Sequence, residues 1–122
     1  MKKILMIEDS KKTSLILKEV LEKTGYIVFL EQDGVSGLSA ARREKPDLIL
    51  LDLLLPKISG FDVCKNLKQD NSTRHIPIII LSTMYNQENM EKMKVLGAVN
   101  FLKKPYRLEE LLLEIKKHLK DE

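Results

Sequence analysis

The sequence predicts an α/β fold in which helices cover both faces of a parallel sheet. Short apolar runs, at residues 4–7, 26–30, 48–51, 78–81 and 99–102, alternate with longer segments that have the amphipathic period of a helix. The helical segments lie at about residues 10–24, 34–44, 59–69, 87–96 and 107–120. Five strands that are each followed by a helix form a parallel sheet between two helical layers.

The strand order follows from how apolar each run is. The first, third and fourth runs, "ILMI", "LILL" and "IIIL", contain only apolar residues, which is typical of central strands buried on both faces. The second and fifth, "YIVFL" and "VNFL", are more mixed and suit the edges. This predicts the order 2-1-3-4-5, a flavodoxin-like (βα)5 three-layer sandwich, whose ligand crevice lies beyond the carboxyl ends of the strands.

Residue types at the helix ends support these boundaries. Ser10 can cap the first helix and Gly25 can close it. Acidic residues in the first turn of the last helix and lysines in its last turn complement the helix dipole. These residues are Glu109, Glu110, Lys116, Lys117 and Lys120.

Composition limits the possible functions. With 43% hydrophobic and 32% charged residues, the chain is expected to form one globular domain over residues 1–122. A net charge of +3 is too small to favour direct nucleic-acid binding. The single cysteine, Cys64, excludes an internal disulfide and fits a reducing compartment. The apolar stretch before Glu8 is too short for a signal peptide or membrane helix, so we expect a cytoplasmic protein without membrane insertion.

Charged and polar residues follow four of the predicted strands. They are Glu8 and Asp9 after the first, Asp52 after the third, Ser82 and Thr83 after the fourth, and Lys103 and Lys104 after the fifth. Because these strands are expected neighbours, the side chains should meet in one crevice. Three carboxylates there would repel one another unless a cation intervened, and Mg²⁺, which prefers oxygen ligands, is the natural candidate.

Such a site suits phosphoryl transfer to a carboxylate. The carboxylate acts as nucleophile, while a metal ion and an ammonium group neutralise charge on the phosphoryl oxygens. Asp52 is the candidate nucleophile because it alone leaves a central, fully apolar strand, within the run "LILLDLLLP". An unpaired carboxylate inside such a run would be costly, so either Asp52 lies at the end of the strand or it is there for chemistry.

The motifs "ILMIEDS", "PDLILLDLLLPKISGFDV", "IPIIILST" and "GAVNFLKKP" together resemble the receiver domains of bacterial two-component response regulators. Each motif alone is weak, but all of them in this order, over essentially the whole chain, make the resemblance specific. It implies that Glu8 and Asp9 form the acidic pair that binds Mg²⁺. It also implies that Asp52 is the phosphorylated aspartate and a metal ligand, and that the backbone carbonyl of Leu54 is the further ligand.

The same resemblance assigns the residues that respond to phosphorylation. Ser82 resembles the hydroxyl residue that moves to a phosphoryl oxygen, although Thr83 could exchange roles with it. Lys104 resembles the lysine that pairs with the phosphoryl group, because it directly precedes Pro105, which resembles the cis proline of the family. Phe101 stands at the position of a switch aromatic, often a tyrosine, that turns inward on activation.

The sequence departs from the family pattern at two positions. The acidic pair is Glu-Asp rather than Asp-Asp, which changes the reach of Glu8 to the metal by one methylene. Phe101 lacks a hydroxyl, so it retains aromatic packing without a hydrogen bond. Lys103, which competes with Lys104 for the site, is expected to be a surface residue.

The first helix carries one leucine outside its apolar face. At about 100° per residue, Ile16, Leu17, Val20 and Leu21 share one arc that should face the core. Leu15 falls instead among charged residues. Lone exposed leucines are common, so Leu15 is equally compatible with an ordinary surface position and with a contact to a partner.

The resemblance implies both upstream and downstream partners. A sensor histidine kinase or histidine phosphotransfer protein would dock beside Leu15 and beside Pro105 and Tyr106, in the loop after the fifth strand. A downstream protein target or output domain would contact the face formed by the fourth helix, fifth strand and fifth helix. A dimer that forms on phosphorylation is compatible with the same resemblance.

The expected activity is limited to the domain's own phosphorylation and dephosphorylation. Leu54 and Met84 would flank the phosphoryl group and cannot orient an attacking water, so we expect slow self-dephosphorylation. A phosphatase of the haloacid dehalogenase type would need a second aspartate two residues after the nucleophile, where Leu54 stands. A degenerate receiver that acts only as a binding module is the other alternative, and failure to bind Mg²⁺ would favour it.

Overall fold

The computed structural model describes residues 1–119, which form alternating strands and helices. The strands are β1 (Lys3–Ile7), β2 (Ile27–Glu31), β3 (Leu48–Leu51), β4 (Ile78–Ser82) and β5 (Asn100–Lys103). The helices are α1 (Lys11–Lys23), α2 (Gly34–Glu44), α3 (Gly60–Gln69), α4 (Gln87–Val95) and α5 (Leu108–Leu119). Each element lies within one residue of its predicted bounds, and Lys120, predicted in the last turn of the final helix, lies outside the described residues.

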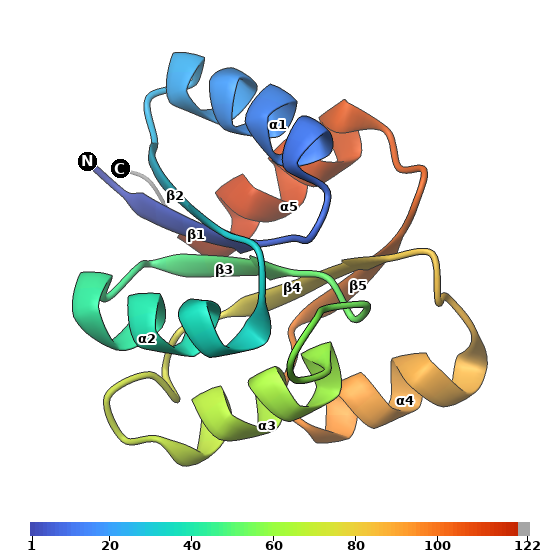
Figure 1. Ribbon diagram of the computed structural model, residues 1–122. Helices are drawn as coiled ribbons and strands as arrows, with labels where there is room; N and C mark the ends of the chain where they lie inside the picture. The colour runs from blue at the N-terminus through green and yellow to red at the C-terminus, as the bar shows by residue number, and fades with distance from the viewer. Residues whose placement is uncertain (120–122) are drawn as a thin grey trace.

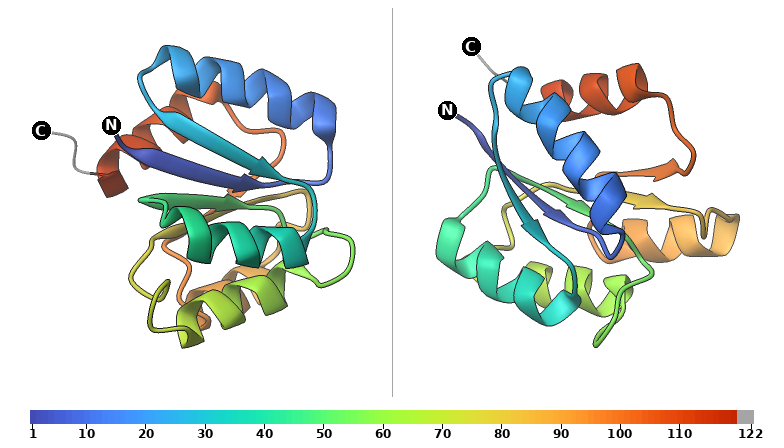
Figure 2. Two further views of the ribbon diagram at one scale, coloured as in Figure 1. Left: turned by 60° about the vertical axis from the view of Figure 1, so that its left-hand side comes forward. Right: turned by 45° about the horizontal axis from the view of Figure 1, so that its top comes forward.

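The strands form one parallel sheet in the order β2-β1-β3-β4-β5, which confirms the predicted flavodoxin-like architecture. Helices α1 and α5 cover one face, and α2, α3 and α4 cover the other, so the sheet is the middle of three layers (Figures 1 and 2). The strands β3 and β4 are buried along their whole length, as expected for inner strands. Within residues 1–119, no helix is both long and apolar enough to cross a bilayer.

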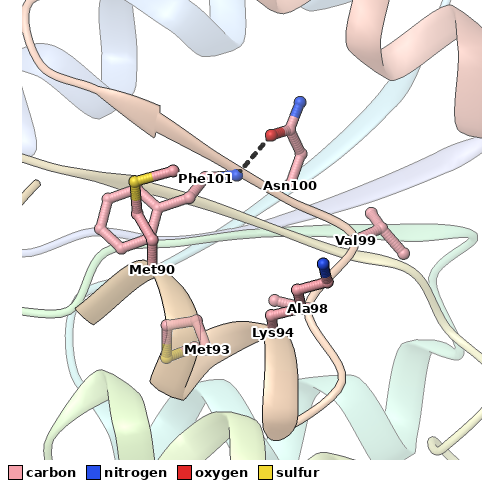
Figure 3. Close-up of a pocket in the computed structure, with 7 residues that line it drawn as sticks. All are labelled: Met90, Met93, Lys94, Ala98, Val99, Asn100 and Phe101. Carbon is pink, nitrogen blue, oxygen red and sulfur yellow. Dashed lines mark hydrogen bonds between the residues drawn. The ribbon is translucent and has the colours of Figure 1, made fainter. Parts of the chain in front are cut away.

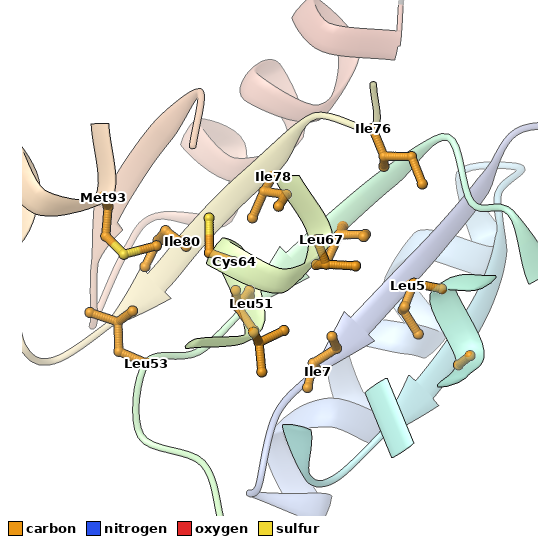
Figure 4. Packing of buried hydrophobic residues seen from close by; sticks show 14 of the residues in the cluster. Leu5, Ile7, Leu51, Leu53, Cys64, Leu67, Ile76, Ile78, Ile80 and Met93 are labelled. Carbon is orange, nitrogen blue, oxygen red and sulfur yellow. The ribbon is translucent and has the colours of Figure 1, made fainter. Parts of the chain in front are cut away.

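The sheet divides the hydrophobic core into two clusters. Successive residues of a strand point to opposite faces, so Leu5 and Ile7 of β1 pack with α2, α3 and α4. Ile4 and Met6 pack with α1 and α5. Figure 4 shows the first cluster, in which Leu67 of α3 lies against the strand residues. Because both faces of the inner strands are covered, these strands appear in the sequence as uninterrupted apolar runs.

Helix α1 buries a narrower stripe than the sequence pattern predicts. Leu17 and Leu21 are buried as expected, but Ile16 is 58% exposed, similar to Leu15 at 49%. The remaining buried position of the helix is Ser14. The prediction that Ile16 faces the core is therefore wrong, because the buried stripe follows spacings of three and four residues from Ser14 and leaves Ile16 to one side.

Candidate functional site

The structure brings three of the expected site residues into contact beyond the carboxyl ends of the strands. Glu8 follows β1, Asp52 follows β3 and Lys104 follows β5. The Lys104 ammonium donates one hydrogen bond to the Glu8 carboxylate and another, of 3.1 Å, to Oδ2 of Asp52. Because both carboxylates are buried, this ammonium is a shared counter-ion for two acids that would otherwise repel each other.

Asp52 lies directly beyond the last residue of β3, as the sequence predicts. Asp52 is only 8% exposed, and its Oδ1 accepts a hydrogen bond of 3.2 Å from the Leu54 N–H. Its own N–H donates to the Ile7 carbonyl oxygen at 3.0 Å, which extends the contact between β1 and β3 by one residue. The apolar strand therefore delivers one carboxylate to the edge of the sheet, where Lys104 offsets the burial of its charge.

The two acids after β1 have different surroundings. Glu8 is 7% exposed and uses both carboxylate oxygens, since Oε1 accepts from Lys104 and Oε2 accepts from the Ser10 N–H at 3.0 Å. Asp9 is exposed, and within residues 1–119 its carboxylate has no hydrogen bond or ion pair. Glu8 and Asp52 are therefore the two acids that the Lys104 ammonium joins. In the described part of the chain, no three His, Cys, Asp or Glu side chains are arranged to hold a metal ion.

The residue types nevertheless fit Mg²⁺. Glu8 and Asp9 lie in the loop after β1, Asp52 lies in the loop after β3, and these two strands pair directly. Their carboxylates, with a backbone carbonyl such as that of Leu54, provide the oxygen-only donor set that Mg²⁺ prefers. The charges also call for a cation, because one ammonium faces two buried carboxylates and Asp9 adds a third acid nearby.

Lys104 is held in place by its backbone as well as by its ammonium. Its N–H donates to the Ser82 carbonyl oxygen at 3.0 Å, and the Lys104–Pro105 peptide bond is cis, as the resemblance to receiver domains implies. Burial alone would lower the pKa of Lys104, but the carboxylates of Glu8 and Asp52 outweigh it and raise that pKa. Lys103 is exposed, so Lys104 is the lysine of this site.

Ser82 is completely buried at the end of β4, whereas Thr83 is exposed. The Ser82 Oγ accepts a hydrogen bond of 3.1 Å from the Met84 N–H, so its hydroxyl is engaged with its own loop. The side chain of Leu54 is exposed and that of Met84 is half-buried. Thr83 lines the open cleft beside Lys104, so the choice of Ser82 over Thr83 as the switch hydroxyl stays a prediction.

Gly60 sets how closely α3 approaches the site, and the sequence reasoning did not single it out. A Cβ atom there would lie 2.4 Å from the Asp52 carbonyl oxygen, so a larger residue would displace the backbone of Asp52. The Gly60 N–H also donates to the Leu53 carbonyl oxygen at 3.0 Å. The available signal was the Ser-Gly pair that follows Pro56 and opens the helix.

Phe101 lies in an inward position. It is 7% exposed, and its ring meets that of Tyr85 edge to face, with centroids 5.4 Å apart and planes at 85°. Together with Met90 and Met93 of α4, it lines a cavity of about 220 Å³ between α4 and β5 (Figure 3). Tyr85, which the sequence reasoning missed, is therefore the contact that links Phe101 to the loop after β4.

The expected partner-binding residues lie in two separate places. Pro105 is exposed and Tyr106 half-buried, and both line an open cleft of about 400 Å³ that also includes Lys104 and Thr83. Burial raises the pKa of the Tyr106 hydroxyl, although nearby Lys104 opposes this. Leu15 lines a different cleft, beside Leu30 at the end of β2.

Comparisons with known proteins agree with this geometry. A family model described as the response regulator receiver domain matches residues 4–116. The polar-differentiation response regulator DivK of Brucella anthropi is 32% identical over 120 residues, which cover 98% of each chain.

Solved structures give the same result. The chemotaxis protein CheY4 of Vibrio cholerae superposes with a TM-score of 0.91 at 29% identity, covering 98% of this chain and 99% of that one. The receiver domain of the sensor histidine kinase PA1611 from Pseudomonas aeruginosa gives a TM-score of 0.89 at 28% identity, covering 98% of both chains. That structure holds a magnesium ion in its active-site cleft.

Proposed function

Since this chain belongs to the response regulator receiver domain family, we propose that it is a phosphorylation-dependent switch with Asp52 as the phosphoacceptor. A sensor histidine kinase or a histidine phosphotransfer protein would supply the phosphoryl group. The observation that carries the proposal is the buried Asp52 carboxylate at the end of a central strand, held by the Lys104 ammonium at 3.1 Å.

The residues around Asp52 suggest how the transfer proceeds. An Asp52 oxygen attacks the phosphorus, a P–O bond forms, and the bond from phosphorus to the donor breaks, with its electron pair leaving on the donor. Lys104 then lies beside the charge that accumulates on the phosphoryl oxygens. The Ser82 Oγ accepts from the Met84 N–H, and its own hydroxyl hydrogen can be donated to one of these oxygens when the side chain turns towards them.

Mg²⁺ is the proposed cofactor, and Glu8, Asp9, Asp52 and the Leu54 carbonyl would hold it. When bound, it would neutralise negative charge on the phosphoryl group. The protein's own contribution is to bring Asp52 and Lys104 together before the donor arrives. We propose that the domain catalyses only its own phosphorylation and dephosphorylation, in the cytoplasm.

The proposed output surface is the face formed by α4, β5 and α5. Phe101 of β5 is already buried, so its response to phosphorylation is a change in packing against Tyr85 and Met90, not entry from solvent. This face would contact a downstream protein or output domain, or a second copy of the chain. Adding beryllofluoride and Mg²⁺ should shift the amide NMR signals of Ser82, Tyr85 and Phe101. Shifts confined to the loops after β1 and β3 would contradict this output surface.

Trapping chemistry tests the phosphoacceptor. The protein is treated with acetyl phosphate and Mg²⁺, and borohydride then reduces the acyl phosphate, so that peptide mass spectrometry finds homoserine at position 52. Asp52→Asn should give no product. Asp62→Asn, which removes an exposed acid on α3, is the matched control and should behave as wild type. Homoserine at another acidic position would refute the assignment.

A further inference from the structure

Glu8 has a different set of contacts from those expected of a free metal ligand. Both of its carboxylate oxygens are occupied, one by the Lys104 ammonium and the other by the Ser10 N–H at 3.0 Å. Its neighbour Asp9 is exposed and has neither kind of contact with residues 1–119. Of the two acids, Glu8 would therefore have to rearrange its contacts with the protein to bind a metal ion, whereas Asp9 would not.

The length of Glu8 makes this double contact possible. The chain reverses after β1, and the Ser10 N–H holds one oxygen of Glu8 at the start of α1, while Lys104 comes from the far side of the site, after β5. An aspartate at position 8 would carry its carboxylate about 1.5 Å, one carbon–carbon bond, further back. It could then keep the contact with Ser10 or approach Lys104, but not keep both in their present arrangement.

Lys104 is thereby pinned between two acids. Its side chain is 20% exposed, and those of Glu8 and Asp52 are 9% and 10% exposed. In such a poorly hydrated site, an ammonium and a divalent cation compete for the same carboxylate charge, because each lowers the negative potential that attracts the other.

We propose that Glu8 positions Lys104 and that the Glu8–Lys104 ion pair holds the site in a closed form which Mg²⁺ has to open. The pair acts as an internal competitor and weakens Mg²⁺ binding relative to an aspartate at position 8. This inference rests on the proposed function, because it concerns how the same site is loaded. It assigns the Glu-Asp sequence a role in setting the Mg²⁺ concentration at which the domain becomes competent.

The test is calorimetric titration of MgCl₂ into metal-free protein, without any phosphodonor. Glu8→Asp should bind Mg²⁺ about tenfold more tightly, the factor that corresponds to losing one charge-assisted hydrogen bond. Lys104→Met should also bind it at least about tenfold more tightly. Lys103→Met removes the same charge from an exposed neighbour and should change the affinity far less. Circular dichroism confirms that each variant is folded.

The double variant Glu8→Asp with Lys104→Met separates the pair from independent effects. If the ion pair is the competitor, the double variant binds Mg²⁺ no more tightly than Lys104→Met alone. If the gains in Mg²⁺ affinity of the two single variants multiply in the double variant, Glu8 and Lys104 act independently and the ion pair is not the competitor. Weaker binding by Glu8→Asp would also refute it, since Glu8 would then be a ligand whose length the metal requires.

Two further outcomes would overturn the inference. Equal affinities of Lys104→Met and Lys103→Met would mean that only net charge matters, and no Mg²⁺ binding by any variant would mean that there is nothing to open. Phosphoryl uptake by the wild-type protein at saturating Mg²⁺, measured on the same preparation, distinguishes the two levels of the account. If the wild-type protein takes up no phosphoryl group, the proposed function is contradicted. If uptake is normal but Glu8→Asp and Lys104→Met do not bind Mg²⁺ more tightly than wild type, only this inference is contradicted.

Discussion

Two half-buried lysines lie at opposite ends of the sheet and have opposite environments. At the carboxyl end, the Lys104 ammonium contacts the carboxylates of Glu8 and Asp52. At the amino end, the Lys68 ammonium donates to the carbonyl oxygens of Arg74 and Ile76, at 3.1 and 2.8 Å, just before β4. Burial lowers the pKa of Lys68, whereas the two carboxylates raise that of Lys104.

The difference distinguishes a structural lysine from a chemical one. Carbonyl oxygens are neutral, so Lys68 ties the end of α3 to the start of β4 without bringing charges together. Lys104 instead holds two carboxylates within reach of each other, and its single positive charge leaves one negative charge that a divalent cation can offset. A site that accepts a phosphoryl group needs such an arrangement, and a joint between two elements does not.

The largest expected effect is on phosphoryl uptake. Lys104→Met should lower the rate of uptake from acetyl phosphate at saturating Mg²⁺ about a hundredfold, because it removes a cation that faces the developing charge. Lys68→Met should leave this rate close to that of wild type. The rate is measured by mass spectrometry over time. Equal rates for the two variants would mean that Lys104 contributes no more to phosphoryl transfer than Lys68 does.

The next effect concerns water at the carboxyl end. Leu54→Asn should speed the decay of the phosphorylated protein about tenfold, because the amide can orient an attacking water that leucine cannot. Leu54→Met keeps the position apolar and should leave the decay unchanged. Decay is followed after the donor is removed, and an unchanged rate in Leu54→Asn would mean that this side chain does not control access of water.

A smaller effect is expected on stability at the amino end. Lys68→Met leaves two backbone carbonyls without their donor and should lower the free energy of unfolding by about 1 kcal/mol. Urea titration measures this, with Lys65→Met on the exposed face of the same helix as the control. The loss should be the same with and without Mg²⁺. If Mg²⁺ restored the free energy of unfolding of Lys68→Met to the wild-type value, Lys68 would be coupled to the site.

The smallest effect is a pH dependence, also at the amino end. A hydrogen bond from Arg42, together with those from Ser72, lowers the pKa of Asp70 to about 2. Because the folded-state pKa lies below the unfolded one, the stabilisation is present above about pH 4 and is lost as the pH falls towards 2. Asp70→Asn should flatten the stability curve slightly in that range. If the free energy of unfolding of Asp70→Asn fell more steeply with decreasing pH than that of the wild type, the pKa of Asp70 would not be lowered by folding.

Much of this structure could be predicted from the sequence, because strands that are buried on both faces consist of uninterrupted apolar residues. The run "LILL" placed β3 at the centre and Asp52 at its end, and the polar residues after the other strands placed the site.

Side-chain pairing could not be predicted in the same way. The contact of Lys104 with Glu8 depends on where two loops, 96 residues apart in the chain, come together. The edge-to-face contact of Tyr85 with Phe101 and the exposure of Ile16 likewise depend on how helices pack, which periodicity alone does not specify. Pattern locates the elements, whereas packing decides which side chains meet.

We propose that the carboxyl end of the sheet is a phosphoryl-accepting site with Asp52 as the acceptor. Intact-mass measurement after treatment with acetyl phosphate, with and without Mg²⁺, is the decisive experiment. We expect one phosphoryl adduct on the wild-type protein in the presence of Mg²⁺ and none on Asp52→Asn. An adduct that persists in Asp52→Asn, or its absence from the wild type with Mg²⁺, would show that Asp52 is not the acceptor.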